Sequence, residues 1–221
     1  MSCKIKGPKD FQRLFGVSDE TLERLVVYEN LLKQWQKKIN LVAPSTLDDI
    51  WHRHFADSAQ LLDLAPKSAR KWVDLGSGAG FPGLVLAILR SGRGLQVDLE
   101  PLILIESDQR KAAFLGEIAR KTSLVVDIAI SRIELSSTQG RYKSVDVVSA
   151  RALAPLDRLI GLAKPLFGPE TVGLFLKGRD VGQEIEAARA KWSFTCELAE
   201  SLTDSEARIA VVTSPEAKSE G

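Results

Sequence analysis

The segment that most constrains the fold is residues 72–90, WVDLGSGAGFPGLVLAILR, in which four glycines and a proline separate two apolar runs. The run KWVDL at 71–75 predicts a buried strand, and PGLVLAILR at 82–90 predicts a helix that tolerates Pro82 in its first turn. Glycines let the backbone between them come close to a ligand, and the start of the helix offers free N–H groups. The segment therefore predicts a strand–loop–helix unit that binds a ligand beyond the end of its strand.

Two kinds of cofactor fit this loop. GAGFPG at 78–83 satisfies the G-x-G-x-x-G pattern of dinucleotide sites, whereas DLGSGAG at 74–80 satisfies the D-x-G-x-G-x-G pattern of methyl-donor sites. The second pattern is favoured because Gly76 follows the strand directly, two residues before the dinucleotide pattern begins. Asp74 at the strand end suits an ammonium group such as that of S-adenosylmethionine. Glu106, at the end of the apolar run LILIE, suits two ribose hydroxyls, but it would serve an NAD site equally well.

Downstream of the loop, apolar runs alternate with amphipathic segments. The expected strands are 101–106, 123–130, 144–150 and 171–178, the expected helices are 108–121, 156–167 and 183–192, and the segments expected to pair as a terminal hairpin are 193–200 and 207–213. This alternation predicts an α/β fold, with a mostly parallel sheet covered by helices on both faces.

The first third of the chain is predicted to be helical. Ser18 is expected to cap a first helix, which Pro44 in the stretch NLVAPS brings to an end. Thr46 and Asp49 are expected to form a capping box for a second helix. The predicted boundaries are an N-terminal helical extension over 1–68, a Rossmann-like domain over 69–214 and a disordered tail over 215–221.

Charge and cysteine content restrict the class of protein. The formal net charge is +1, so the chain is not strongly basic overall, although its lysines and arginines occur in clusters. No apolar run reaches the roughly 18 residues of a membrane span. The start MSCKIKGPKDF lacks the apolar region of a signal peptide, which predicts a cytoplasmic protein. Cys3 and Cys196 have no metal-ligand spacing, and no metal site is predicted.

Seven blocks occur in order along the chain: LLKQWQKKINLV (31–42), RHFADS (53–58), WVDLGSGAGFPG (72–83), LIESDQRKAAFL (104–115), SRIE (131–134), SARA (149–152) and LFLKG (174–178). Together they resemble the bacterial 16S ribosomal RNA guanine-N7 methyltransferases known as RsmG, formerly GidB. The resemblance implies the class I S-adenosylmethionine-dependent methyltransferase fold, with a mostly parallel seven-stranded sheet and S-adenosylmethionine as cofactor. It also implies N7 methylation of one specific guanine in 16S rRNA, by a monomer acting on the small ribosomal subunit or its precursor.

The resemblance also implies site residues, position by position. Gly76 and Phe81 match loop residues that line the cofactor pocket, and Glu106 matches the acid that binds the ribose. Ile133 and Glu134 match the pair that flanks the adenine, whose exocyclic amine is expected to donate to the Glu134 carboxylate. The predicted cofactor-binding set is Asp74, Gly76, Gly78, Gly80, Phe81, Glu106, Ile133, Glu134 and Arg151.

Arg151 matches an arginine after the fourth strand that faces cofactor and substrate, and it is the predicted catalytic residue. Guanine N7 carries an in-plane lone pair and no proton, so in-line methyl transfer to it needs positioning and electrostatics but no general base. The chain is consistent with that chemistry, because SARALAPL stands where exocyclic-amine methylases keep an NPPY-type loop. It also lacks the Pro-Cys pair of pyrimidine C5 methylases.

Several basic residues are candidates to contact RNA. Arg151 and Lys177 suit the guanine O6 atom or a phosphate. Arg53 is expected to pair with Asp57 at the i, i+4 spacing of a helix. Arg179 departs from the family, in which an uncharged polar residue stands at that position. The predicted RNA contacts are Lys177, Lys33, Lys37, Lys38, Arg53 and His54, with the cluster Lys67–Lys71 in the same footprint.

Two other functions fit parts of the sequence. An NAD-linked oxidoreductase would use the GAGFPG reading, but it needs a catalytic His or Tyr with a partner, and Tyr28 and Tyr142 have no obvious one. A ribosome-assembly or RNA-binding module could keep a methyltransferase fold without catalysis. The intact loop, together with Glu106 and Arg151, favours the enzyme.

Overall fold

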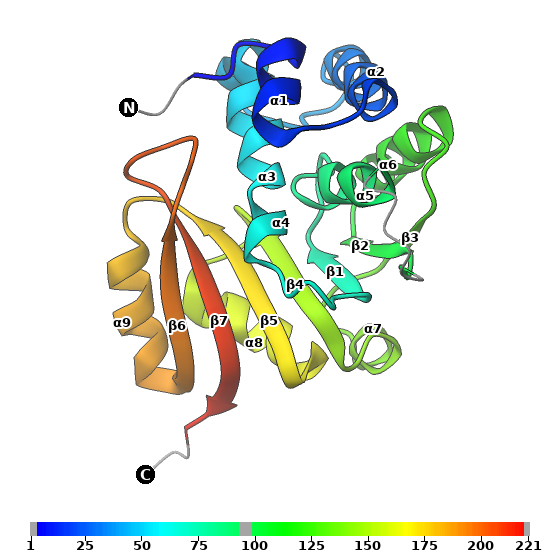
Figure 1. The fold of residues 1–221 in the computed structure, drawn as a ribbon. Helices are drawn as coiled ribbons and strands as arrows, with labels where there is room; N and C mark the ends of the chain where they lie inside the picture. The colour runs from blue at the N-terminus through cyan, green and yellow to red at the C-terminus, as the bar shows by residue number, and fades with distance from the viewer. Residues whose placement is uncertain (1–3, 93–98, 219–221) are drawn as a thin grey trace.

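A single seven-stranded sheet organises the molecule, in a computed structural model that describes residues 4–92 and 99–218. Its strand order is β3-β2-β1-β4-β5-β7-β6; β7 runs antiparallel to both β5 and β6, and the other neighbouring strands are parallel (Figure 1). The strands are β1 (Trp72–Leu75), β2 (Leu102–Glu106), β3 (Val126–Ile130), β4 (Val145–Arg151), β5 (Phe167–Lys177), β6 (Trp192–Glu200) and β7 (Arg208–Ala217). The predicted alternation and the terminal hairpin β6–β7 are confirmed.

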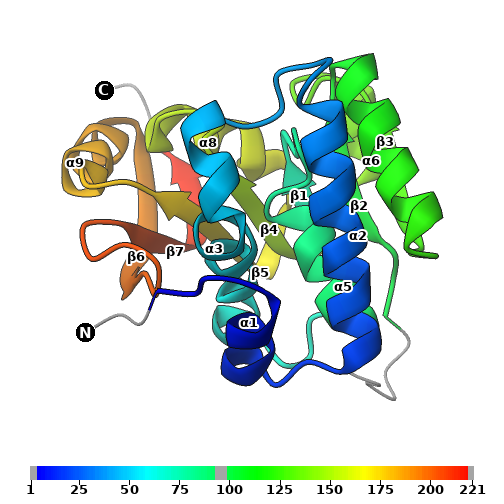
Figure 2. The same cartoon turned by 90° about the horizontal axis from the view of Figure 1, so that it is seen from above.

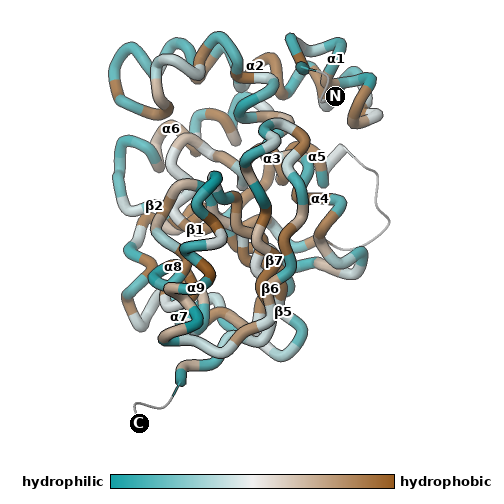
Figure 3. Tube along the Cα trace, turned by 90° about the vertical axis from the view of Figure 1, so that its left-hand side faces the viewer, coloured by the Kyte–Doolittle hydropathy of each residue, from teal (hydrophilic) through white to brown (hydrophobic). Residues whose placement is uncertain are grey.

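Helices cover both faces of the sheet. One face packs against α1 (Pro8–Phe15), α2 (Asp19–Trp35), α5 (Gly83–Gly92), α6 (Gln109–Lys121) and the turns η1 (Pro44–Asp49), η2 (Trp51–Ala56), α3 (Asp57–Ala59) and α4 (Leu61–Leu64). The other face packs against α7 (Ser136–Arg141), α8 (Leu156–Ala163), η3 (Lys164–Leu166) and α9 (Val181–Lys191). Figure 2 shows α2 lying alongside α5 and α6, and Figure 3 shows hydrophobic residues alternating with hydrophilic ones along α2.

The N-terminal extension shares its core with the sheet domain. Tyr28 of α2 is fully buried, stacks on Phe81 of the glycine loop at 5.3 Å and contacts Phe55 of η2 at 5.3 Å. The Tyr28 hydroxyl also donates to the Ala79 carbonyl. A boundary near residue 68 therefore marks a change of secondary structure, while hydrophobic burial joins both sides of it.

Of the two capping predictions in the extension, one is confirmed and one is wrong. Ser18 does cap α2, accepting from the Thr21 N–H at 3.2 Å. Thr46, however, caps nothing: Pro44–Asp49 form a 3-10 turn and Trp51–Ala56 a π-helical turn. Short segments of this kind replace an α-helix where tertiary contacts demand a different side-chain spacing, and π-turns cluster at functional sites.

The predicted disordered tail is also corrected. Strand β7 continues to Ala217, because its pairing with β6 extends to the Trp192–Ala217 register. Glu216 pairs with Lys164 at 2.6 Å, which ties this end of the strand to the 3-10 turn η3. Residues 219–221 of the predicted tail lie outside the described residues. Within the described ranges, no helix is long and apolar enough to cross a bilayer.

Candidate active site

A cavity of about 330 Å³ opens at the carboxyl ends of β1, β2 and β3, where a parallel sheet binds ligands. It is called the donor cavity below. Five predicted cofactor-binding residues line it: Gly76, Gly78, Glu106, Ile133 and Glu134. The order of the strands brings these residues together from sequence positions up to 58 apart (134 − 76).

The glycine loop and Glu106 form one hydrogen-bonded unit in this cavity. Gly76 and Gly78 adopt left-handed backbone, with φ of 62° and 55°, which other residues rarely adopt. The Gly78 N–H donates to Glu106 Oε2 at 2.8 Å, and the Asp108 N–H donates to Oε1 at 2.7 Å. Each carboxylate oxygen keeps further acceptor capacity. The fixed carboxylate therefore suits a pair of ribose hydroxyls.

The two residues predicted to flank an adenine differ in exposure. Ile133 is buried and offers an apolar wall, whereas Glu134 is exposed and lies 3.9 Å from Arg158. Glu134 and Arg158 both line the donor cavity. A surface ion pair of this length adds little stability, so the Glu134 carboxylate can exchange its partner readily.

Asp74 lies beneath the loop and outside the donor cavity. Its carboxylate is fully buried, accepting from Ser149 Oγ at 2.7 Å and from the Gly83 N–H at 3.2 Å. Burial raises its pKa to about 6. A direct contact with an ammonium group would require the carboxylate to leave these partners. In this structure Asp74 fixes the loop from below.

Phe81 and Gly80 are likewise part of the loop's support. Phe81 is buried between the rings of Tyr28 and His54, at 5.3 and 4.8 Å. Gly80 has φ of 90°, and a Cβ at this position would lie 2.5 Å from the Tyr28 hydroxyl. Neither residue lines the donor cavity.

A second cavity, of about 660 Å³, opens at the carboxyl ends of β4 and β5. It is called the acceptor cavity below. The N-terminal segment 41–57 and the β6–β7 connection enclose it together with the strand ends. Ala152, Leu153 and Ala154 line both cavities. We call Ala152–Pro155 the wall segment, because its first three residues line both cavities.

Arg151 lies at the end of β4 and lines the acceptor cavity only. Its Nη1 donates to the Arg53 carbonyl at 3.1 Å and lies 3.4 Å from Asp57 Oδ2, and its guanidinium lies 4.8 Å over the Phe81 ring. Burial lowers the pKa of Arg151, and the Asp57 charge opposes that effect. The result is a fixed positive charge in the cavity, next to the wall segment.

His54 holds Arg151 from the other side. Arg151 Nη2 donates to His54 Nδ1 at 2.8 Å. The Thr46 hydroxyl donates to the Ala43 carbonyl at 2.7 Å, which leaves His54 Nε2–H to donate to Thr46 Oγ1 at 2.8 Å. Burial, Arg151 and Arg53 lower the pKa of His54 to about 3. The imidazole is therefore neutral, and its one lone pair is already engaged.

The predicted Arg53–Asp57 ion pair is wrong. Arg53 instead pairs with Asp204 at 3.3 Å, and Asp57 faces Arg151. The reason is tertiary: Asp57 Oδ2 faces Arg151 from β4, and Asp57 Oδ1 accepts from Thr203 of the β6–β7 connection.

The β6–β7 connection contributes residues that sequence reasoning missed. Thr203 donates to Asp57 Oδ1 at 2.8 Å, and its carbonyl accepts from His52 Nε2 at 2.9 Å. In Figure 1 this connection reaches the N-terminal helices. Only hairpin pairing places residues 203–204 beside 52–57, so no local pattern could have revealed them.

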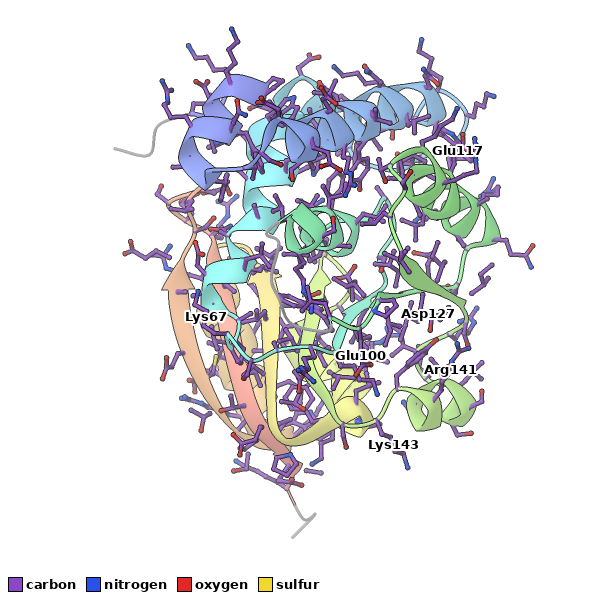
Figure 4. The ribbon with its side chains drawn as sticks, turned by 45° about the vertical axis from the view of Figure 1, so that its right-hand side comes forward. Lys67, Glu100, Glu117, Asp127, Arg141 and Lys143 are labelled. Carbon is purple, nitrogen blue, oxygen red and sulfur yellow. The ribbon has the colours of Figure 1, made fainter. Side chains whose placement is uncertain are left out.

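The predicted lysine contacts to RNA occupy four different settings. Lys177 is nearly buried and pairs with Glu184 at 2.6 Å, whereas Lys33 pairs with Glu29 on the surface at 2.7 Å. Lys37 and Lys38 are exposed and make no ion pair within the described ranges. The Lys67–Lys71 cluster precedes β1 and therefore lies at the opposite end of the sheet from both cavities. Lys67 of this cluster is labelled in Figure 4.

Comparisons with known proteins agree with this architecture. A family model described as GidB, rRNA small subunit methyltransferase G, matches residues 21–210. A protein of Parvibaculum lavamentivorans named Ribosomal RNA small subunit methyltransferase G is 53% identical over 207 residues, 93% of this chain and 88% of the relative. One of the same name from Methylobacterium radiotolerans is 52% identical over 198 residues, 90% of each chain.

Solved structures show the same fold at low sequence identity. An O-methyltransferase from Bacillus cereus in complex with SAH has a TM-score of 0.54 and 15% identity, over 89% of this chain and 91% of that one. A putative O-methyltransferase from Klebsiella pneumoniae has a TM-score of 0.56 and 15% identity, over 85% of this chain and 90% of that one. The predicted class I S-adenosylmethionine-dependent methyltransferase fold is confirmed.

Proposed function

The chain belongs to the rRNA small subunit methyltransferase G family, and from that premise we propose that it methylates N7 of one specific guanine in 16S rRNA with S-adenosylmethionine. The observation that carries the proposal is the pair of cavities on either side of the wall segment. A transferase needs its two substrates to meet at one point, and Ala152–Ala154 border both spaces. The proposed reaction is an in-line displacement without a general base.

The residues of the donor cavity fit the proposed cofactor. The Glu106 carboxylate is oriented for a vicinal diol by two backbone N–H groups. Left-handed Gly76 and Gly78 leave the loop without side chains where a ligand must approach. Ile133 supplies an apolar surface for an adenine. S-Adenosylmethionine, when bound, supplies a methyl group activated by a sulfonium.

The acceptor cavity suits a base that needs charge stabilisation and no deprotonation. Arg151 is a fixed cation there, and its role in the proposal is to contact guanine O6 or an adjacent phosphate. His54 is neutral, and its Nδ1 lone pair accepts a hydrogen bond from Arg151, so this nitrogen is not available to take up a proton. This arrangement supports stabilisation and positioning as the source of catalysis.

The decisive experiment maps the modifications of 16S rRNA by mass spectrometry in cells with and without this protein. We expect one 7-methylguanosine to disappear when the gene is deleted and to return when it is restored. Loss of ribosome assembly without loss of a methyl group would instead support the non-catalytic RNA-binding module. An unchanged RNA would refute the proposal.

Cofactor choice can be tested by calorimetric titration of the purified protein. We expect S-adenosylhomocysteine to bind and NADH to give no heat, because Glu106 and the loop are arranged around a short donor cavity of about 330 Å³. Replacing Glu106 with alanine should weaken S-adenosylhomocysteine binding by about 1.5–3 kcal/mol, the value of hydrogen bonds to a charged group. Tight NADH binding would favour the oxidoreductase.

The pH dependence of the reaction tests the absence of a general base. The pKa of His54 is lowered to about 3, so its protonation does not change between pH 7 and 9. We therefore expect a single-turnover methylation rate at saturating substrates that is flat over this range. A histidine base of ordinary pKa would instead make the rate fall as the pH drops below about 6.5. The measurement should therefore extend down to pH 5.5, where we expect no loss of rate from protonation of His54.

The RNA footprint can be tested by charge reversal. Lys37 and Lys38 are exposed and lie just before Leu41–Ala43, which line the acceptor cavity. We expect the double variant Lys37→Glu, Lys38→Glu to weaken RNA binding and to flatten its dependence on salt. The matched control is Lys67→Glu with Arg70→Glu, at the far end of the sheet, which should change both less. Equal effects of the two variants would contradict this orientation.

A further inference from the structure

The wall segment is held in a conformation that needs external support. Ala152 has φ of 52°, in the left-handed region that non-glycine residues rarely occupy. Leu153 packs against the glycine loop, since a Cβ on Gly76 would lie 2.6 Å from Leu153 Cδ1. The N-terminus of α8, which follows the wall segment, has no capping side chain of its own. The segment that borders both cavities is thus neither helix nor strand, and its own backbone does not fix it.

Lys177 and Glu184 supply that support from outside the segment. Lys177 Nζ donates to the Ala154 carbonyl at 2.7 Å and to Glu184 Oε2 at 2.6 Å. Glu184 Oε2 also accepts from the Leu156 N–H at 2.8 Å, in place of the missing cap of α8. The Lys177 side chain is 8% exposed and the Glu184 side chain 27%, so the ammonium group is shielded from solvent and the carboxylate is partly buried. The ion pair therefore holds the C-terminal end of the wall segment, at the Ala154 carbonyl and at the Leu156 amide that follows it.

We propose that Lys177 and Glu184 are a positioning pair, which sets the distance between the donor and acceptor cavities by fixing the wall segment. The inference rests on the proposed function and deepens it. It replaces the expectation that Lys177 binds RNA, since two of its three N–H groups are already committed within the protein. Both residues line the acceptor cavity, but their polar atoms are bonded to the wall segment and to each other. A displaced wall would misalign the two substrates, and misplacement by about 1 Å costs about 100-fold in rate.

The two residues carry opposite charges and bind each other, so single and double variants can be compared to test whether they act as a pair. We would measure single-turnover methylation of small subunits by Lys177→Met, Glu184→Ala and the double variant. Both single variants should lower the rate constant about 10- to 100-fold at saturating substrates. The KM for RNA and for S-adenosylmethionine should stay within about twofold, and the double variant should be no slower than the slower single variant. Glu184→Gln, which keeps an acceptor for the Leu156 N–H, should recover part of the rate.

A matched control exists on α9, the helix that carries Glu184. Lys191 of α9 pairs with Asp157 of α8 at 2.7 Å but makes no contact with the wall segment. Lys191→Met should therefore leave the rate unchanged. Hydrogen exchange gives a readout that needs no substrate: the Leu156 amide should exchange faster in Lys177→Met and in Glu184→Ala, and at the native rate in Lys191→Met.

The possible outcomes separate the competing roles. If Lys177 binds RNA, Lys177→Met will raise the KM for RNA and reduce the salt dependence of binding, while Glu184→Ala will do neither. Three results would each overturn the positioning role: this pattern of RNA binding, additive effects of the two substitutions, or exchange of the Leu156 amide at the native rate. If the wild-type protein fails to methylate RNA, the proposed function fails, and the exchange measurement alone then decides whether the pair fixes the wall segment.

Discussion

Replacing Arg151 with alanine should lower the rate of small-subunit RNA methylation by about 100- to 1,000-fold while leaving the affinity for S-adenosylhomocysteine unchanged. Arg151 is the fixed cation of the acceptor cavity, and it does not line the donor cavity. Removing one preorganised charge of this kind costs about 10²–10³-fold in rate. Single-turnover assays on purified subunits would measure the loss, and calorimetry with S-adenosylhomocysteine would measure cofactor binding.

The stability of this variant must be followed alongside its activity. Arg151→Ala leaves Asp57 Oδ2 and His54 Nδ1 without their donor, while Asp57 Oδ1 keeps Thr203, and the loss is expected to cost about 1–3 kcal/mol of unfolding free energy. Arg151→Lys keeps the charge but loses the fork that reaches both partners, so it should fold and remain strongly impaired. Arg141→Ala is a suitable control, because Arg141 pairs with Asp127 on the surface. Full activity of Arg151→Ala would refute its catalytic role, and weakened cofactor binding would return Arg151 to the cofactor site.

Replacing Gly80 with alanine should destabilise the whole protein by about 2–5 kcal/mol. A left-handed residue with a Cβ costs about 1–2 kcal/mol, and φ at Gly80 is 90°. The added methyl would lie 2.5 Å from the Tyr28 hydroxyl and 2.6 Å from Leu84 Cδ1, and such overpacking costs about 1–3 kcal/mol. Neither neighbour can move easily, because Tyr28 is fully buried and its hydroxyl donates to Ala79.

Urea unfolding would measure this loss as a lower midpoint at an unchanged slope. Gly182→Ala is the matched control, since a Cβ at Gly182 meets nothing within 4 Å and its backbone is not left-handed. Alanine in helix α9 should be neutral or stabilising. Equal stability of Gly80→Ala and the wild-type protein would show that the loop and Tyr28 are not packed as described.

Much of the fold could be predicted because its signals are local. The strand at 71–75, the glycines that follow it and the helix behind Pro82 form one unit in sequence and in space. The alternating strands and helices leave few arrangements, since parallel neighbours require crossover helices. Glu106 was predictable for the same reason, as the last residue of a strand next to the loop. In the N-terminal segment, however, the helical pattern did not reveal the π-turn at Trp51–Ala56, which contacts from elsewhere stabilise.

The sequence alone determined which segments form strands and helices, where the glycine loop lies and which residues stand at the strand ends. It could do so because backbone geometry and hydrophobic periodicity act over a few residues. Only the tertiary structure decided what each polar side chain does there. It placed Asp74 beneath the loop with Ser149, Arg151 on His54 and Asp57, and Lys177 on Glu184. The physical reason is that a buried charge takes whichever partner the fold brings within hydrogen-bonding distance, and those partners lie 7 to 97 positions away along the chain.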